Sequence, residues 1–172
     1  MRNDLFLDSF FTVIETFIMN DSTCLVWTSY GARCTSDTEV IIHSYQEWGT
    51  DCVKKFDGMF AFGIWDKNRE TFFLARDRLG IKPLVYYLDE DIFIFASEIK
   101  AILVHPGIDK TRDDTAIYDY LTYGYIPSPK TPYRKIRKLE AAHTFVFAGN
   151  VSHYSKYWDI DFVVIGFVVW KI

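Results

Sequence analysis

Residues that could do chemistry are densest from Arg76 to Leu84, a stretch that reads Arg-Asp-Arg-Leu-Gly-Ile-Lys-Pro-Leu. Arg76 and Asp77 are adjacent there, and Gly80 and Pro83 interrupt otherwise strand-like sequence. Because glycine permits backbone conformations closed to other residues and proline fixes φ, the stretch is predicted to be a shaped loop. The charged pair could orient a substrate or shape a domain interface, or it could satisfy backbone groups where strands meet the loop.

Cysteine and histidine show no spacing that predicts catalysis or metal binding. The cysteines are Cys24, Cys34 and Cys52, and this odd number without metal-ligand spacing argues against a disulfide framework and a zinc site. It indicates a reducing, cytoplasmic setting, in which the cysteines are small packing or surface residues. The four histidines are scattered, and His43 is expected at the surface of a helix. We therefore predict no catalytic residue and no metal site.

Two predicted β-hairpins flank the Arg76–Leu84 loop. Residues 59–65 and 71–75 are apolar and aromatic, with a polar turn between them. Because the first of these strands is apolar at consecutive positions, both of its faces should be covered, so its sheet is predicted to be an inner layer. The second hairpin joins residues 85–87 to residues 92–96, and a short helix should follow and end by Val104.

Further elements lie on either side of these hairpins. A helix is predicted at Ser36-Asp37-Thr38-Glu39, where a hydroxyl is followed three residues later by a carboxylate, and Gly49 is placed to end it. Residues 51–56 should form a short second helix. Asp113 can cap a helix that runs to about Leu121.

The last third of the chain predicts an arm and a hairpin. The prolines of residues 125–132 predict an extended, rigid arm, because each proline biases its predecessor away from helix. Residues 144–148 and 151–157 are predicted to pair as a final hairpin.

Four segments carry a family resemblance: GMFAFGIWD at residues 58–66, FLARDRLGIKPL at 73–84, FASEIKAIL at 95–103 and YLTYGYIP at 120–127. Together they resemble the glutamine amidotransferase domain of glutamine-hydrolysing asparagine synthases, from about Ser36 to about Tyr157. The resemblance implies an α+β fold, a four-layer αββα sandwich of antiparallel sheets of the N-terminal-nucleophile hydrolase type, here expected to be incomplete.

The resemblance also implies a reaction. The family hydrolyses glutamine with an N-terminal cysteine whose α-amine, with a pKa of about 8, takes the thiol proton. A second domain of the family uses ATP and Mg to activate aspartate. This sequence has Arg2 at position 2 and no phosphate-loop segment. It is therefore expected to be a truncated domain without the ATP-dependent synthetase domain, with no cofactor of its own and no activity alone.

The resemblance assigns one residue to the site. The aspartate of the family's Ser-Asp-x-Glu segment binds the α-amino group of glutamine, and Asp37 occupies that position. A carboxylate in the first turn of a helix stays ionised and can pair with an ammonium, although Asp37 could instead merely complement the helix dipole. Arg76 and Asp77 are candidates for shaping the site.

The predicted boundaries are a divergent segment at residues 1–30, an amidotransferase-like domain at residues 31–161 and a divergent apolar tail at residues 162–172. The first segment fits either a helical stripe or a strand pair with a turn at Asn20-Asp21. Neither end has the features of a signal peptide or a membrane span, so no membrane association is predicted.

Charge and composition restrict the partners. The 172 residues carry 19 basic and 23 acidic side chains, a net charge of −4 that gives no reason to expect a nucleic acid. The one basic run, Arg134, Lys135, Arg137 and Lys138, is interpreted as a solvated face. The partners expected are glutamine, bound weakly if at all, and a synthetase-domain polypeptide or a second copy of the chain. The alternative function is a non-catalytic interaction module of the same fold.

Overall fold

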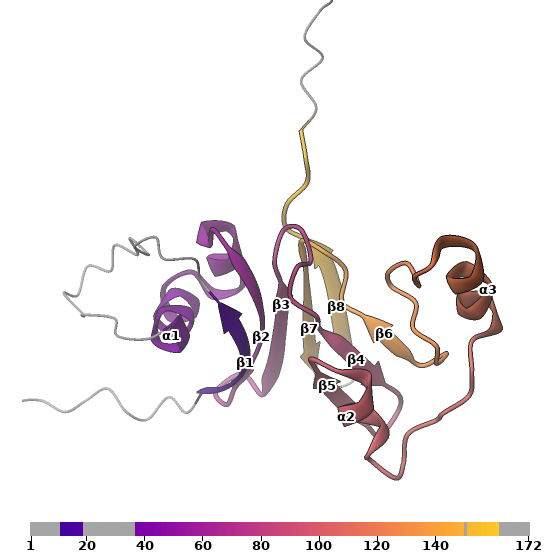
Figure 1. The fold of residues 1–172 in the computed structure, drawn as a ribbon. Coiled ribbons are helices and arrows are strands. Elements are labelled where there is room, and N and C mark those ends of the chain that lie inside the picture. The colour runs from indigo at the N-terminus through magenta and orange to yellow at the C-terminus, as the bar shows by residue number, and fades with distance from the viewer. Residues whose placement is uncertain (1–10, 19–36, 150, 162–172) are drawn as a thin grey trace, which may run out of the picture.

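The computed structural model describes residues 11–18, 37–149 and 151–161, and their elements form four layers (Figure 1). Helix α1 (Asp37–Trp48) and the 3₁₀ helix η1 (Gly49–Lys55) cover one face of a five-stranded sheet. A three-stranded sheet packs on its other face, and α2 (Ile99–Leu103) covers the outer face of that smaller sheet. The predicted α+β sandwich of antiparallel sheets is therefore confirmed.

All neighbouring strands in the two sheets are antiparallel. The larger sheet has the order β1 (Phe11–Ile18), β2 (Met59–Asp66), β3 (Thr71–Arg76), β7 (His143–Ala148) and β8 (Val151–Lys156). The smaller sheet has the order β5 (Phe93–Ala96), β4 (Val85–Leu88) and β6 (Ile136–Lys138). Helix α3 (Asp114–Tyr123) lies between α2 and β6 in the chain.

The three predicted hairpins are present as β2–β3, β4–β5 and β7–β8. Strand β2 is buried on both faces, which confirms that its sheet is an inner layer. Gly63 lies at the point of closest approach, since a Cβ there would meet the ring of Phe95 at 2.5 Å and Cδ2 of Leu74 at 2.8 Å. The second sheet can therefore pack against β2 only because residue 63 has no side chain.

Strand β1 was one of two alternatives for its segment, and strand β6 was not predicted. Strand β1 pairs along the whole of β2, from Phe11 opposite Asp66 to Ile18 opposite Met59. Residues 11–18 are thus a strand rather than part of a helical stripe, while the turn considered at Asn20-Asp21 lies outside the described residues. Strand β6 has only three residues, and its position in the smaller sheet is fixed by pairing with β4. A strand this short carries too little alternation to be recognised in sequence.

The predicted helix starts agree with the structure. Helix α1 starts at Asp37 and ends before Gly49, whose φ is +57°. Its buried side chains are Val40, Ile41, Ser44 and Tyr45. The predicted second helix is η1. Helix α3 starts after Asp113, whose carboxylate accepts a hydrogen bond from the backbone N–H of Thr115 at 3.1 Å, so the predicted N-cap is confirmed.

The proline-rich segment is bent, so the prediction of an arm that is extended throughout was wrong. The backbone N–H of Lys130 donates to the carbonyl of Pro127 at 3.0 Å, which closes a turn. Thr131 follows as a fully buried residue, and its hydroxyl donates to the carbonyl of Ile136 at 2.7 Å. Proline disfavours helix in the residue before it, but it is well suited to turns.

Three apolar clusters fill the spaces between the four layers. The largest, between the α1–η1 layer and the five-stranded sheet, includes Ile41, Phe56, Phe60, Phe62 and Phe73. The second lies between the sheets, and the third between the smaller sheet and α2. No helix in the described part of the chain has the length and apolar character needed to cross a membrane.

Candidate functional site

The loop after β3 is organised by the carboxylate of Asp77. This side chain is 1% exposed, and it accepts hydrogen bonds from three backbone N–H groups: those of Leu79 at 3.1 Å, Ile81 at 2.9 Å and Lys82 at 2.9 Å. Its own backbone N–H donates to the carbonyl of Phe60 at 2.8 Å. The carboxylate therefore serves the backbone of its own loop.

Arg76 ties this loop to the segment that follows β6. Its Nε donates to the carbonyl of Lys82 at 2.7 Å, and its Nη2 to the carbonyl of Gly80 at 2.7 Å. Its Nη1 donates to the carbonyl of Leu139 at 2.5 Å. Burial lowers the pKa of Arg76, because it removes water that stabilises the charged guanidinium and the backbone carbonyls replace that water only in part.

Gly80 allows the loop to close against Arg76. Its φ is +66°, and a Cβ there would lie 3.1 Å from Cβ of Ala141 and 3.3 Å from Cζ of Arg76. The loop is also held from the far end of the domain, since the hydroxyl of Tyr157 donates to the carbonyl of Arg76 at 2.8 Å. Arg76 and Asp77 together form a rigid, hydrogen-bonded corner, and a direct role in substrate binding stays a prediction.

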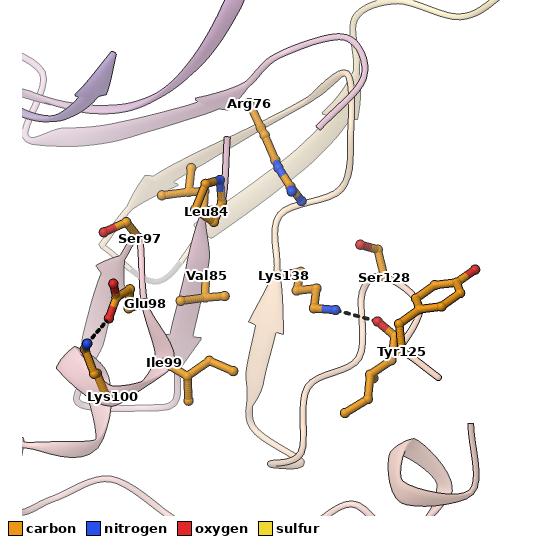
Figure 2. A pocket seen from close by; sticks show the side chains of 12 residues that line it. Arg76, Leu84, Val85, Ser97, Glu98, Ile99, Lys100, Tyr125, Ser128 and Lys138 are labelled. Carbon is orange, nitrogen blue, oxygen red and sulfur yellow. Dashed lines mark hydrogen bonds and ion pairs between the residues drawn. The ribbon is translucent and has the colours of Figure 1, made fainter. Parts of the chain in front are cut away.

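A cavity of about 510 Å³ lies beside Arg76 (Figure 2). Its walls come from the end of β3, the start of β4, the end of β6 and residues 97–100 and 125–128. Lys138, the last residue of β6, lines this cavity, and its Nζ donates to the carbonyl of Ile126 at 2.5 Å. Burial, and after it the positive charge of Arg76, lowers the pKa of Lys138.

Asp37 is the first residue of α1, on the opposite face of the larger sheet from the smaller sheet. Its side chain is partly exposed, and no residue in the described ranges forms a hydrogen bond or ion pair with it. The helix terminus stabilises its negative charge. Asp37 can therefore accept a cationic group, but it shares no contact with Arg76 or Asp77.

The described part of the chain contains no other obvious catalytic group. Cys52 is fully buried, and burial raises the pKa of its thiol to about 12, so it is neutral at physiological pH. Cys24 and Cys34 lie outside the described residues. His43 is partly exposed and contacts Gln46 at 3.2 Å. No group of three or more His, Cys, Asp or Glu side chains within the described ranges is placed to hold a metal ion.

Sequence reasoning missed Lys138, which it assigned to a solvated basic run. Arg134 and Lys135 of that run are exposed, but Lys138 is only partly so. Because side chains two residues apart in a strand share a face, Lys138 follows the fully buried Ile136 toward the interior. The two-residue spacing of Ile136 and Lys138 is visible in the sequence. It predicts burial of Lys138 only once residues 136–138 are known to be a strand.

Residues 25–158 match the family described as "Glutamine amidotransferase domain". The chain is 42% identical over 128 residues to asparagine synthetase (glutamine-hydrolyzing) 3 of Bacillus subtilis, covering 74% of this chain and 21% of that protein. It is 53% identical over 140 residues to asparagine synthetase (glutamine-hydrolyzing) 2 of the same organism, covering 77% of this chain and 19% of that protein. The chain thus spans about a fifth of the length of these relatives.

Among solved structures, the chain is similar to a glutamine phosphoribosylpyrophosphate amidotransferase from Bacillus subtilis complexed with ADP and GMP. The TM-score is 0.47 with 19% sequence identity, and the match covers 72% of this chain and 23% of that chain. That likeness is slight, and the fold is established by the two sheets themselves.

Proposed function

Because the chain belongs to the family of glutamine amidotransferase domains, we propose that it is the glutaminase part of an asparagine synthetase. Asparagine synthetases of this type amidate aspartate with ammonia taken from glutamine and with ATP bound by a separate synthetase domain. The observation that carries this proposal is the 42% and 53% identity to two glutamine-hydrolysing asparagine synthetases over about three quarters of the chain. In the cell, the chain is proposed to act in the cytoplasm.

Asp37 is the proposed contact for the α-ammonium group of glutamine. It has the position of the glutamine-binding aspartate in the resembling motif, and its carboxylate has no competing partner in the described ranges. Arg76 and Asp77 are proposed to shape the neighbouring chain rather than to touch glutamine. Backbone N–H groups take up the carboxylate of Asp77, and Arg76 lines a cavity on the other side of the larger sheet from Asp37. Rigid support of this kind fixes the geometry of a site without taking part in the reaction.

The chain is proposed not to hydrolyse glutamine alone. Hydrolysis in this family needs a thiolate with a nearby base. Cys52, the cysteine that the described part contains, is shielded from solvent and has a raised pKa. A buried neutral thiol is a poor nucleophile toward a substrate that must arrive from water.

Glutamate release tests this part of the proposal. The purified full chain is incubated with glutamine, and glutamate is measured against a sample without protein and one heated to unfold the protein. We expect no release above these backgrounds. Steady turnover would overturn the claim of inactivity, and the variants Cys24→Ala, Cys34→Ala and Cys52→Ala would then identify the nucleophile.

A second candidate function, a non-catalytic interaction module, is favoured by helix α3. This helix buries only Ala116. Its other large apolar side chains and the tyrosine that follows are exposed: Ile117, Tyr118, Tyr120, Leu121, Tyr123 and Tyr125. An exposed apolar surface of this kind is typical of a site that contacts another protein. The partner proposed is a synthetase-domain polypeptide or a second copy of the chain.

Sedimentation velocity separates these partners. The chain is run over a range of concentrations, alone and mixed with a separately expressed synthetase domain. The double variant Tyr118→Ser and Leu121→Ser should lose any complex that forms, whereas Ile160→Ser, at an exposed apolar residue outside α3, should retain it. A monomer that never associates in either experiment would remove this second candidate.

A further inference from the structure

The cavity beside Arg76 has an excess of positive charge. Four charged side chains line it: Arg76, Lys100, Lys138 and Glu98. The single carboxylate, that of Glu98, pairs with Nζ of Lys100 at 2.6 Å. Arg76 and Lys138 therefore remain without a carboxylate of their own in the cavity, which leaves it with a net charge of +2 (Figure 2).

The surroundings of Arg76 and Lys138 do not neutralise these charges. Within the described ranges, neither side chain forms an ion pair, and both donate hydrogen bonds to backbone carbonyls. The negative charge of Asp77 acts on Arg76, but the oxygens of Asp77 are occupied by backbone N–H groups. Carbonyl dipoles solvate a cation without cancelling its charge.

Arg76 and Lys138 are brought together by the fold. Arg76 ends β3 in the larger sheet and Lys138 ends β6 in the smaller sheet, so the packing of the two sheets brings both side chains to one cavity. The positive charge of Arg76 lowers the pKa of Lys138, after the larger effect of burial. A bound anion would relieve this repulsion and would add charge-assisted hydrogen bonds.

The uncharged residues of the cavity indicate what kind of group the ligand carries besides its anionic group. Leu84, Val85 and Ile99 give it apolar walls, and Ser97 and Ser128 add hydroxyl groups near its edge. Its volume of about 510 Å³ is in the range of small-molecule sites. We propose that this cavity binds a small organic oxyanion, a carboxylate or a phosphate on an apolar body, between Arg76 and Lys138.

This site is distinct from the one proposed for glutamine. It is cationic and is lined by the end of the smaller sheet and by residues 97–100 and 125–128, whereas Asp37 is anionic and lies in the layer of α1. The oxyanion site does not depend on any glutaminase activity, so failure of one proposal leaves the other standing.

An NMR titration of the full chain tests the site with four probes. Inorganic phosphate and phenyl phosphate represent the phosphate source, and acetate and benzoate represent the carboxylate source, all at constant ionic strength with chloride as the reference anion. We expect saturable shifts of the backbone amides of Ser97, Ser128 and Lys138. Because of the apolar walls, benzoate should bind more tightly than acetate, and phenyl phosphate more tightly than phosphate.

Two lysine variants supply the matched comparison. Lys138→Met should weaken binding at least about tenfold, because it removes a charge-assisted bond from a partly buried site. Lys135→Met removes a charge from the same basic run but outside the cavity lining, and it should leave the affinity unchanged. Should Lys138→Met fail to fold, Lys138→Gln replaces it, with folding checked by its amide spectrum.

The proposal would be overturned by no saturable shift with any probe at tens of millimolar, by the same shifts with chloride, or by equal affinity in Lys138→Met and the unsubstituted chain. Shifts confined to α3 and residues 123–125 would also overturn it, since they would place the anion on a different surface.

Discussion

The loop after β3 and the start of helix α1 each present an aspartate, and the two carboxylates lie in opposite surroundings. Asp77 is 1% exposed and accepts three backbone hydrogen bonds. Asp37 is partly exposed and has no partner in the described ranges. A carboxylate whose oxygens already accept backbone N–H groups holds a fold together, whereas one left open at a helix terminus can accept a ligand. Both aspartates lie in segments that carry the family resemblance, so the resemblance alone does not tell a structural carboxylate from one that could bind a ligand.

The largest effect should come from Asp77→Ala. Removing the carboxylate leaves the N–H groups of Leu79, Ile81 and Lys82 without their acceptor. We expect the free energy of unfolding to fall by about 2–4 kcal/mol, since buried unsatisfied donors are costly. Urea unfolding followed by tryptophan fluorescence measures the change.

Asp57→Ala is the control for this change, because the side chain of Asp57 is 96% exposed. Its one ion pair in the described ranges is a long surface contact, 3.5 Å from Oδ1 to Nη1 of Arg78. It should alter stability by no more than about 0.5 kcal/mol. Similar losses in the two variants would show that Asp77 does not organise the loop.

A smaller effect is expected from Gly80→Ala. The substitution places a side chain at φ +66° and pushes its Cβ against Ala141 and Arg76. Backbone strain alone should cost about 1 kcal/mol. Gly124→Ala isolates that strain, since Gly124 has φ +76° and nothing within 4 Å of an added Cβ. Differential scanning calorimetry should show a larger drop in Tm for Gly80→Ala, and equal drops would mean that the loop does not need close contact at residue 80.

The hairpins and helices of the central region could be predicted because each carries a local signal. The apolar run of β2 and the capping residue Asp113 act over a few neighbouring residues, and the structure agrees with both. Strand β1 was left open between a helix and a strand, and strand β6 was missed, because the places of both depend on distant partners, β2 and β4. The turn at Pro127 was missed because proline restricts its neighbours without fixing the direction of the chain.

The candidate site was predictable in its residues but not in their arrangement. Arg76, Asp77 and Asp37 were singled out from sequence, yet only the fold shows that the first two bind backbone groups and that the third lies in another layer. The partial burial of Lys138 could not be predicted, because its surroundings are formed by residues 125–128 and by Arg76, which are distant in sequence.

Tyr157→Phe probes the outer support of the loop. The hydroxyl of Tyr157 donates to the carbonyl of Arg76 at 2.8 Å, across 81 residues of sequence. Its loss should lower the free energy of unfolding by about 1 kcal/mol, the ordinary value of one such hydrogen bond. Tyr118→Phe, at a tyrosine that is 72% exposed, serves as the control and should leave stability unchanged within the error of urea unfolding. A loss of the same size at residue 118 would mean that the bond of Tyr157 adds nothing.

The smallest change in stability is expected from Asp37→Asn, and it tests the open member of the pair. Losing a charge near a helix N-terminus should cost about 0.3–1 kcal/mol. If Asp37 holds the ammonium of glutamine, glutamine should raise the Tm of the unsubstituted chain, and Asp37→Asn should abolish that rise. Asp114→Asn removes a carboxylate from the same position of helix α3, so it should show the same loss of stability but keep the response to glutamine. A glutamine-induced rise of equal size in all three proteins would show that Asp37 serves only its helix, as Asp77 serves only its loop.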